Sequence, residues 1–327
     1  MLANYRKSLL VAVILFIAVC MIAPTMAATT QVQIVKYAND GTTILNQTTV
    51  NFTWMMNNLP VLGDGVTHYY HQGPVFLDDE NNETHEQELR WNPEEDNNWD
   101  TKDMGAVKGT NLKDLCDLVG GMSPGEEVKI LATDGWYKWF AYKNVYEYST
   151  REGPIVICWY KDGMYPDSGY SEGMRMVWFA EATYKEGPTS IAGLPSGYYH
   201  VFGNWDWHEA ADSKYWYYYQ SGDEKYPTTT GLSGQVVNRI YIYSDDPVPT
   251  PPVAAFSSDT QTGTAPLTVQ FTDQSTGTTP LTYAWDFDND GTIDSTDQNP
   301  NHTYTSPGTY TVNLTVSNAV GCDSEVK

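Results

Sequence analysis

The sequence predicts two domains of different class, an α+β domain followed by an all-β sandwich. Three observations support this division. A helical stripe and a hairpin lie together in residues 108–142, prolines crowd residues 245–252, and period-two apolar runs fill residues 253–327. Because a chain of 327 residues is longer than most single domains, we place the domain boundary at the proline-rich segment.

Residues 1–27 have the composition of a secretory signal peptide. Arg6 and Lys7 form a basic start, an apolar run covers residues 9–22, and Thr25 and Ala27 supply small residues at the expected cleavage site. We therefore expect an exported protein, secreted or held at the cell surface. After removal of this signal no segment is long and apolar enough to predict a transmembrane span.

The charge of the chain is strongly negative, with a formal net charge of −23. Nucleic acids and anionic lipids need basic patches on a partner protein. The composition therefore argues against nucleic acid as a partner. It suits a soluble exported protein, and solubility alone is the favoured interpretation, with salty surroundings or the gathering of cations as alternatives.

The large domain, residues 28–244, contains one clear helix pattern. Leu112, Leu115, Cys116 and Val119 recur at helical spacing and predict a helix with one buried face. The pair of glycines at residues 120–121 predicts its end, because glycine adopts the left-handed C-cap conformation without steric cost.

Alternation and β-branched residues predict the strands of this domain. An Asp-Gly pair at residues 134–135 predicts a hairpin turn between two of them. The predicted strands span residues 31–37, 49–55, 128–132, 136–142, 154–160, 174–180 and 236–243. Together these elements make the large domain α+β and rich in strands.

Beyond the proline-rich linker, residues 245–252, the composition changes. Residues 267–271, 281–287 and 310–316 each alternate between apolar and polar side chains, which predicts antiparallel strands around one core. The run Tyr-Ala-Trp-Asp-Phe-Asp-Asn-Asp-Gly at residues 283–291 resembles the first signature of PKD domains, and residues 302–318 resemble the second.

This resemblance covers residues 253–327 and implies an Ig-like sandwich that serves extracellularly for spacing, adhesion or contact with proteins and glycans. Such domains usually have one more strand than the alternating runs account for. We therefore expect either a fragment or a domain that lacks its last edge.

Alternating carboxylates in the same stretch resemble a calcium loop. A hard cation takes several oxygen ligands, and a glycine lets the loop turn sharply around it. The expected ligands are Asp286, Asp288, Asp290 and Asp294. The competing interpretation is a solvated hairpin in which Asp286 accepts hydrogen bonds from the turn backbone.

The order of residues 105–115, 124–125 and 128–136 resembles the oxidoreductase molybdopterin-binding fold of sulfite-oxidase-like enzymes. That family ligates molybdenum through a cysteine upstream of the helix, and residues 28–107 contain no cysteine. The resemblance implies a sulfite-oxidase-like core. We do not expect the molybdopterin cofactor, and whether the chain is an enzyme stays open, with a non-catalytic protein favoured.

Cys116 and Cys158 lie within apolar runs and are expected to be buried as small hydrophobic residues. His68, His71 and His85 could ligate a metal, but two histidines three residues apart converge only on a helix, and the surrounding glycines oppose one. We expect these histidines to have structural roles.

Aromatic residues crowd residues 198–219 among polar ones. Flat rings rimmed by polar groups can stack on sugars, whereas buried rings only build a core. The candidate glycan contacts are Trp205, Trp207, Tyr215 and Trp216. Five Asn-x-Thr sequons predict glycosylation in a host that glycosylates, at Asn46, Asn51, Asn82, Asn301 and Asn313.

The sequence therefore predicts a secreted or cell-surface protein without catalysis, which serves surface assembly, adhesion or contact with surface proteins or glycans. Two alternatives are an exported molybdopterin-dependent oxidoreductase and a carbohydrate-binding protein that uses residues 198–219.

Overall fold

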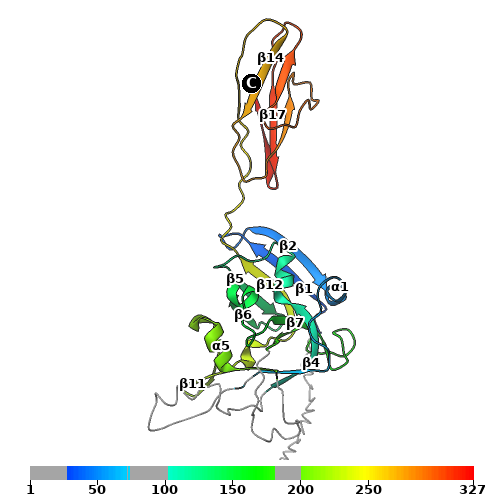
Figure 1. Ribbon diagram of the computed structural model, residues 1–327, viewed down its shortest axis with the longest axis vertical. Helices are drawn as coiled ribbons and strands as arrows, with labels where there is room; N and C mark the ends of the chain where they lie inside the picture. The colour runs from blue at the N-terminus through cyan, green and yellow to red at the C-terminus, as the bar shows by residue number, and fades with distance from the viewer. Residues whose placement is uncertain (1–27, 72, 74–101, 181–199) are drawn as a thin grey trace, which may run out of the picture.

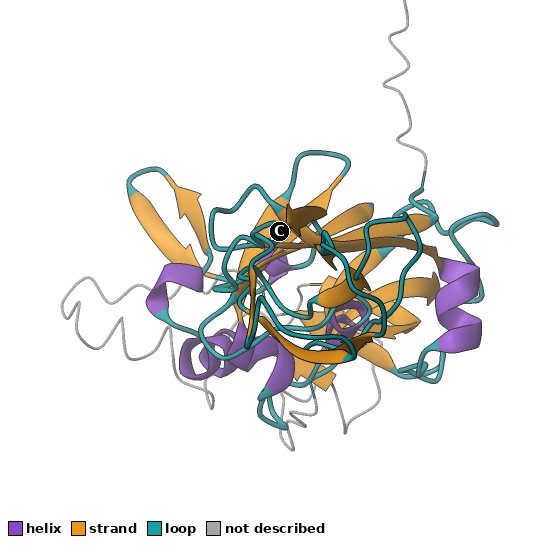
Figure 2. Ribbon diagram, turned by 90° about the horizontal axis from the view of Figure 1, so that it is seen from above, coloured by secondary structure: helices purple, strands orange, loops and turns teal. Residues whose placement is uncertain are grey.

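The computed structural model describes residues 28–71, 73, 102–180 and 200–327. Figure 1 shows a larger β-rich domain and a smaller sandwich joined by a short extended segment. Figure 2 shows that strands dominate the described chain and that its helices are short. The predicted signal peptide lies outside the described residues. Within the described part, no helix is long and apolar enough to cross a membrane.

The first sheet of the large domain has five strands in the order β2-β1-β12-β5-β6. β1 and β12, from opposite ends of the domain, are parallel neighbours in its centre, and the other pairs are antiparallel. Its strands are β1 (Gln31–Tyr37), β2 (Ile44–Asn51), β5 (Glu127–Ala132), β6 (Tyr137–Ala141) and β12 (Val237–Tyr243). The domain is thus closed by pairing its first strand with its last.

The second sheet has the order β8-β7-β4-β3-β9. Its strands are β3 (His68–His71), β4 (Lys102–Asn111), β7 (Ile155–Lys161), β8 (Arg175–Trp178) and β9 (His200–Phe202). The short helices are α1 (Phe52–Asn58), α3 (Leu112–Asp117), α4 (Tyr142–Tyr146), α5 (Asn204–Ala210) and the 3-10 turns η1 (Ser213–Tyr215) and η2 (Thr230–Leu232). A two-stranded hairpin, β10 (Tyr218–Ser221) and β11 (Glu224–Pro227), follows η1.

The core of the large domain lies between these two sheets and includes the predicted helix face. Leu112, Leu115 and Cys116 are fully buried, and Val119 is 2% exposed. The helix α3 is shorter than its apolar stripe, and the chain turns at Gly120, which has a φ of 99°. The predicted burial of this face is therefore confirmed.

The prediction of a strand over residues 49–55 is wrong beyond Asn51. The Asn51 side chain accepts a hydrogen bond from the N–H of Trp54 at 2.8 Å, which caps helix α1. Phe52 and Met55, three residues apart, bury their side chains in the core. Capping and packing thus outweigh the strand preference of this segment.

The C-terminal domain is a sandwich of two three-stranded sheets, β13-β14-β16 and β15-β17-β18. Its strands are β13 (Phe256–Ser258), β14 (Leu267–Asp273), β15 (Thr282–Asp286), β16 (Asn301–Tyr304), β17 (Asn313–Asn318) and β18 (Gly321–Val326). Trp285, Leu314 and Val316 are fully buried between the sheets. The predicted alternation is confirmed, and residues 321–326 form an additional edge strand.

Hydrogen bonds fasten both ends of the proline-rich segment. At its start, the Asp246 carboxylate pairs with Lys36 at 3.0 Å, and its carbonyl accepts the N–H of Asn39 at 2.8 Å. At its end, Thr250 N–H donates to Thr278 Oγ1 at 2.8 Å. Residues 247–249 are left as the short connection between the two domains.

We predict that Gly153→Ala unfolds the large domain or destabilises it by several kcal/mol. Gly153 has a φ of 68°, and an added Cβ would lie 2.1 Å from the Phe179 carbonyl oxygen. Gly163 is the matched control, because its φ is 87° and nothing lies within 4 Å of an added Cβ. Gly163→Ala should cost only about 1 kcal/mol. Chemical denaturation of both variants checks this, and equal losses would contradict it.

Candidate functional site

The predicted cation ligands lie in the loop that follows β15 in the C-terminal domain. Asp286, Asp288 and Asp294 each place one carboxylate oxygen within 4.8 Å of the others. Asp290 lies outside this trio, and its Oδ1 accepts a hydrogen bond from the N–H of Thr292 at 2.7 Å. The fold therefore brings three of the four predicted oxygen donors together.

Asp286 also holds the loop backbone in place. Its two carboxylate oxygens accept hydrogen bonds from the N–H groups of Asp290 at 3.2 Å and Gly291 at 2.8 Å. Desolvation by itself would raise the pKa of Asp286, but these backbone donors outweigh it and hold the pKa below its ordinary value. Asp286 thus performs the structural role that the competing interpretation gave it.

Asp288 is exposed and experiences the opposite effect. Desolvation and the neighbouring charges of Asp290 and Asp294 raise its pKa above the ordinary value. Carboxylates held this close repel one another when all are ionised, and a bound cation would relieve that repulsion. Oxygen donors of this kind suit Ca²⁺.

The candidate glycan contacts of residues 198–219 mostly belong to the core. Trp207 is 2% exposed and Tyr215 is 8% exposed, and both belong to the central apolar cluster. The prediction that these two rings stack on a sugar is therefore wrong, since neither presents a face to a ligand. Trp216 is partly buried and stacks on His208 with ring centroids 4.3 Å apart. The side chain of Trp205 lies outside what the structure describes.

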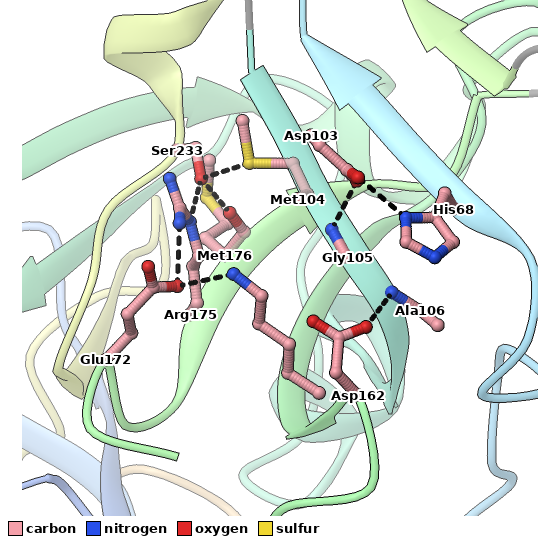
Figure 3. Close-up of polar contacts among 11 residues, drawn as sticks. His68, Asp103, Met104, Gly105, Ala106, Asp162, Glu172, Arg175, Met176 and Ser233 are labelled. Atoms are coloured by element: carbon pink, nitrogen blue, oxygen red, sulfur yellow. Dashed lines mark hydrogen bonds and ion pairs between the residues drawn. The ribbon is translucent and has the colours of Figure 1, made fainter. Parts of the chain in front are cut away.

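The histidines of β3 do not converge. His71 is fully buried, accepts the N–H of Trp178 at 3.3 Å and lies 3.2 Å from the Thr229 carbonyl. His68 is exposed and lies 2.7 Å from an Asp103 carboxylate oxygen (Figure 3). Because His68 and His71 are on a strand, three residues place them on opposite faces. Their expected structural roles agree with this geometry, and His85 lies outside the described residues.

A buried ion cluster joins β8 to neighbouring elements of the large domain. Figure 3 shows Arg175, which donates to Glu172 at 2.7 Å and to Ser233 Oγ at 2.8 Å. Lys161 approaches the same Glu172 oxygen at 3.4 Å. Arg175 is only 7% exposed, so these contacts compensate for its desolvation. The cluster fixes strand positions.

The two cysteines of the large domain are buried in its core, as predicted. Cys116 and Cys158 are both free and fully buried. Burial raises the pKa of each thiol, which disfavours the thiolate that a metal needs. Within the described residues, neither thiol fits the ligand position that a molybdopterin centre requires.

A cavity of about 200 Å³ opens beside α4 and α5. Two buried carboxyl groups line it, Glu152 at 2% and Asp206 at 4% exposed. Asn144 donates to Glu152 at 2.9 Å, and Arg151 donates to Asp206 at 2.7 Å. These contacts tie the segment after α4 to α5, so the carboxyl groups already serve the fold. No residue pattern around Glu152 in the sequence predicted this burial.

The sequons occupy strands and strand ends. Asn46, Asn51 and Asn301 are exposed, and Asn313 is partly buried in the central strand β17. Asn82 lies outside the described residues. Exposure is compatible with glycosylation at the first three positions, and the modification itself stays a prediction.

A family model for the PKD domain matches residues 249–327. These residues form a PKD domain. The crystal structure of the PKD1 domain of Vibrio anguillarum Epp is also similar, at 34% identity over 24% of this chain and 92% of that chain, with a TM-score of 0.21. The signature tryptophan, Trp285, is fully buried at the centre of the sandwich.

A search of the curated proteins finds no match to this chain. The family match begins within the proline-rich linker, so it includes Thr250, whose N–H donates a hydrogen bond to Thr278 of the PKD domain. The resemblance of the large domain to the sulfite-oxidase-like fold is not shown by these comparisons. Its described architecture is β-rich with short helices.

We predict a pH-dependent effect of Glu152→Gln. Burial raises the pKa of Glu152 to about 7 from an ordinary value of 4.5. The folded state therefore holds this proton more tightly, and the associated stability is lost as pH rises from about 4.5 through 7. Glutamine does not ionise, so the variant should not show this loss. Its free energy of unfolding relative to wild type should therefore be roughly 2–3 kcal/mol higher at pH 8 than at pH 5.

Denaturant titrations at both pH values measure that difference. Glu209→Gln is the control, because Glu209 lines the same cavity with an exposed side chain. It should show no such gain. An equal pH response in the two variants would contradict the raised pKa of Glu152.

Proposed function

We propose that this chain is an exported surface protein whose PKD domain makes contact with proteins or glycans, without catalysis. The observation that carries the proposal is the PKD domain at residues 249–327, since such domains are typical of extracellular proteins. The signal-like residues 1–27 and the net charge of −23 support export and surface exposure.

The proline-rich linker supports a role in which one domain holds the other away from the surface to which it is attached. Its two ends are hydrogen-bonded to the two domains, and residues 247–249 between them include two prolines. Proline restricts the backbone to an extended form. Such a connection holds two domains apart with little slack, which suits a spacing or adhesion module.

Ca²⁺ is the proposed ligand of the trio Asp286, Asp288 and Asp294. The support is the convergence of three carboxylate oxygens within 4.8 Å, together with the repulsion that raises the pKa of Asp288. Two of these side chains also bond to the loop backbone, Asp286 to Gly291 and Asp294 to Phe287. A cation there would stiffen the loop between β15 and β16.

We predict that Ca²⁺ raises the Tm of the PKD domain and that Asp288→Asn abolishes the increase. The increase should shrink as pH falls, because cation binding requires the ionised trio and must displace protons. Differential scanning calorimetry with Ca²⁺ or a chelator measures it. Asp290→Asn is the control, since Asp290 is outside the trio. An unchanged Tm with Ca²⁺ would reject the site.

The contact itself can be tested with a photo-crosslinking residue in the full chain. Val320 and Ile293 are exposed hydrophobic residues of the PKD domain, at 47% and 61%. A crosslinker at either position should capture a cell-surface protein or glycan on intact cells of the native host. Val66 of the large domain, 77% exposed, is the control position. Capture only from Val66, or retention of the protein inside the cell, would contradict the proposal.

The alternative of an exported molybdopterin-dependent oxidoreductase has no supporting observation in the described residues. Metal analysis by mass spectrometry of protein from the native host distinguishes the two functions. Molybdenum at about one atom per chain would overturn the non-catalytic proposal, because molybdenum is redox-active and its stoichiometric binding implies a redox site.

A further inference from the structure

The first sheet of the large domain has one face turned away from the core between the two sheets. Val32, Ile34, Ile240 and Ile242 point into the core between the sheets. The alternate residues of the same strands therefore point outward. Figure 1 shows this sheet at the end of the domain from which the spacer leaves.

Five aromatic residues gather on that outward side. They are Tyr37, Tyr137, Trp139, Tyr241 and Tyr243, named here the outer aromatic face. Strand register places them on adjacent strands, with Tyr37 beside Tyr243 on β1 and β12. β5 lies between β12 and β6. The face therefore spans four strands of one sheet.

Ring contacts join four of these five aromatic residues. Tyr37 stacks on Tyr243 with centroids 5.4 Å apart and meets the edge of Tyr241 at 5.5 Å. Trp139 lies 4.9 Å from Tyr243 and also touches the core. Tyr137 is 53% exposed. Unlike Trp207 and Tyr215, these rings are partly exposed to solvent.

Two cations lie among these rings. Lys129 Nζ is 4.3 Å from the ring centroid of Tyr137 and 5.0 Å from that of Trp139. Arg239 lies two residues before Tyr241, and its Nε has no hydrogen-bond partner among the described residues. Neither cation forms an ion pair within the described part of the chain.

Six other cations of the large domain form ion pairs with carboxylates of this chain, whereas Lys108, Lys113 and Lys138 lie over aromatic rings, as Lys129 does. Those in ion pairs are Lys36, Lys143, Arg151, Lys161, Arg175 and Lys214. Glu127, the acidic residue at the end of the outer face, is itself paired with Lys214 at 2.7 Å. The face therefore combines aromatic surface with two cations that have no carboxylate partner among the described residues, on a chain whose net charge is −23.

We propose that the outer aromatic face binds a saccharide that carries a carboxylate, of the uronic acid type. The rings would stack on sugar faces, and Lys129 and Arg239 would meet the carboxylate. This inference goes beyond the proposed contact of the PKD domain and adds a glycan-binding surface on the large domain. The acidity of the whole chain opposes a long polyanion, so the ligand is a short acidic segment.

Calorimetric titration of the full chain with short oligogalacturonates tests the proposal, with maltodextrins as uncharged probes. Oligogalacturonates should bind, and maltodextrins should bind more weakly. Tyr137→Ser and Tyr241→Ala should each weaken binding about tenfold, and Lys129→Gln together with Arg239→Gln should abolish the preference for the acidic sugar. Trp54→Ala and Tyr219→Ala are controls at exposed aromatic residues outside this face, and they should bind as wild type.

Each other outcome overturns the outer-face assignment in a recognisable way. Loss of binding in Trp216→Ala alone would keep glycan contact but move it to residues 198–219. Binding to phosphatidylserine vesicles instead of saccharides, lost in the Lys129→Gln and Arg239→Gln variant, would make the face a membrane surface. Absence of saccharide binding would reject the outer aromatic face as a binding site. The contact of the PKD domain is tested separately, by crosslinking through Val320. Thermal unfolding confirms that each variant is folded.

Discussion

The large domain depends on the burial of an aromatic cluster between its two sheets. Trp178 stacks on Phe202 at 4.4 Å, and Trp207 lies 4.9 Å from Trp178 and 5.9 Å from Phe140. These rings come from β8, β9, α5 and β6, so one cluster fixes elements from distant parts of the chain. Aromatic side chains bury more area than any others, which compensates for helices too short to be stable alone.

That burial separates structural aromatic residues from accessible ones. Trp207 of α5 and Tyr215 of η1 serve the core, whereas Tyr37, Tyr241 and Tyr243 of the first sheet lie on its outward face. The same separation applies to charge. Arg175 and Glu172 pair in a partly buried cluster, and Lys129 and Arg239 lie among partly exposed rings without an ion pair in the described chain. Residues with an internal partner stabilise the fold, and residues without one are the candidates for ligand binding.

The PKD domain departs from this separation within one loop. Asp286 is 7% exposed and accepts two backbone hydrogen bonds, so it shapes the turn that holds Asp288 near Asp294. The turn also requires Gly291 at a φ of 92° and Asn289 at 56°. Structural demand and metal-binding capacity therefore coincide in one residue. Residues 247–249, which are held by hydrogen bonds on either side, connect this domain to the acidic large domain.

The sequence by itself determined the period-two strands of the PKD domain, the buried helix face at Leu112 and Leu115, and the hairpin turn at Asp134, because each depends on neighbours close in the chain. Only the tertiary structure decided that Asn51 starts a helix, that Trp207 and Tyr215 are core residues, and that Glu152 is buried. The burial of Trp207, Tyr215 and Glu152 depends on contacts between distant segments, and the helix after Asn51 combines a local cap with the core packing of Phe52 and Met55. An aromatic or acidic residue has the same letter whether it is buried or exposed, so the sequence could not place the outer aromatic face. Strand order and register brought Tyr37, Tyr137 and Tyr241 together.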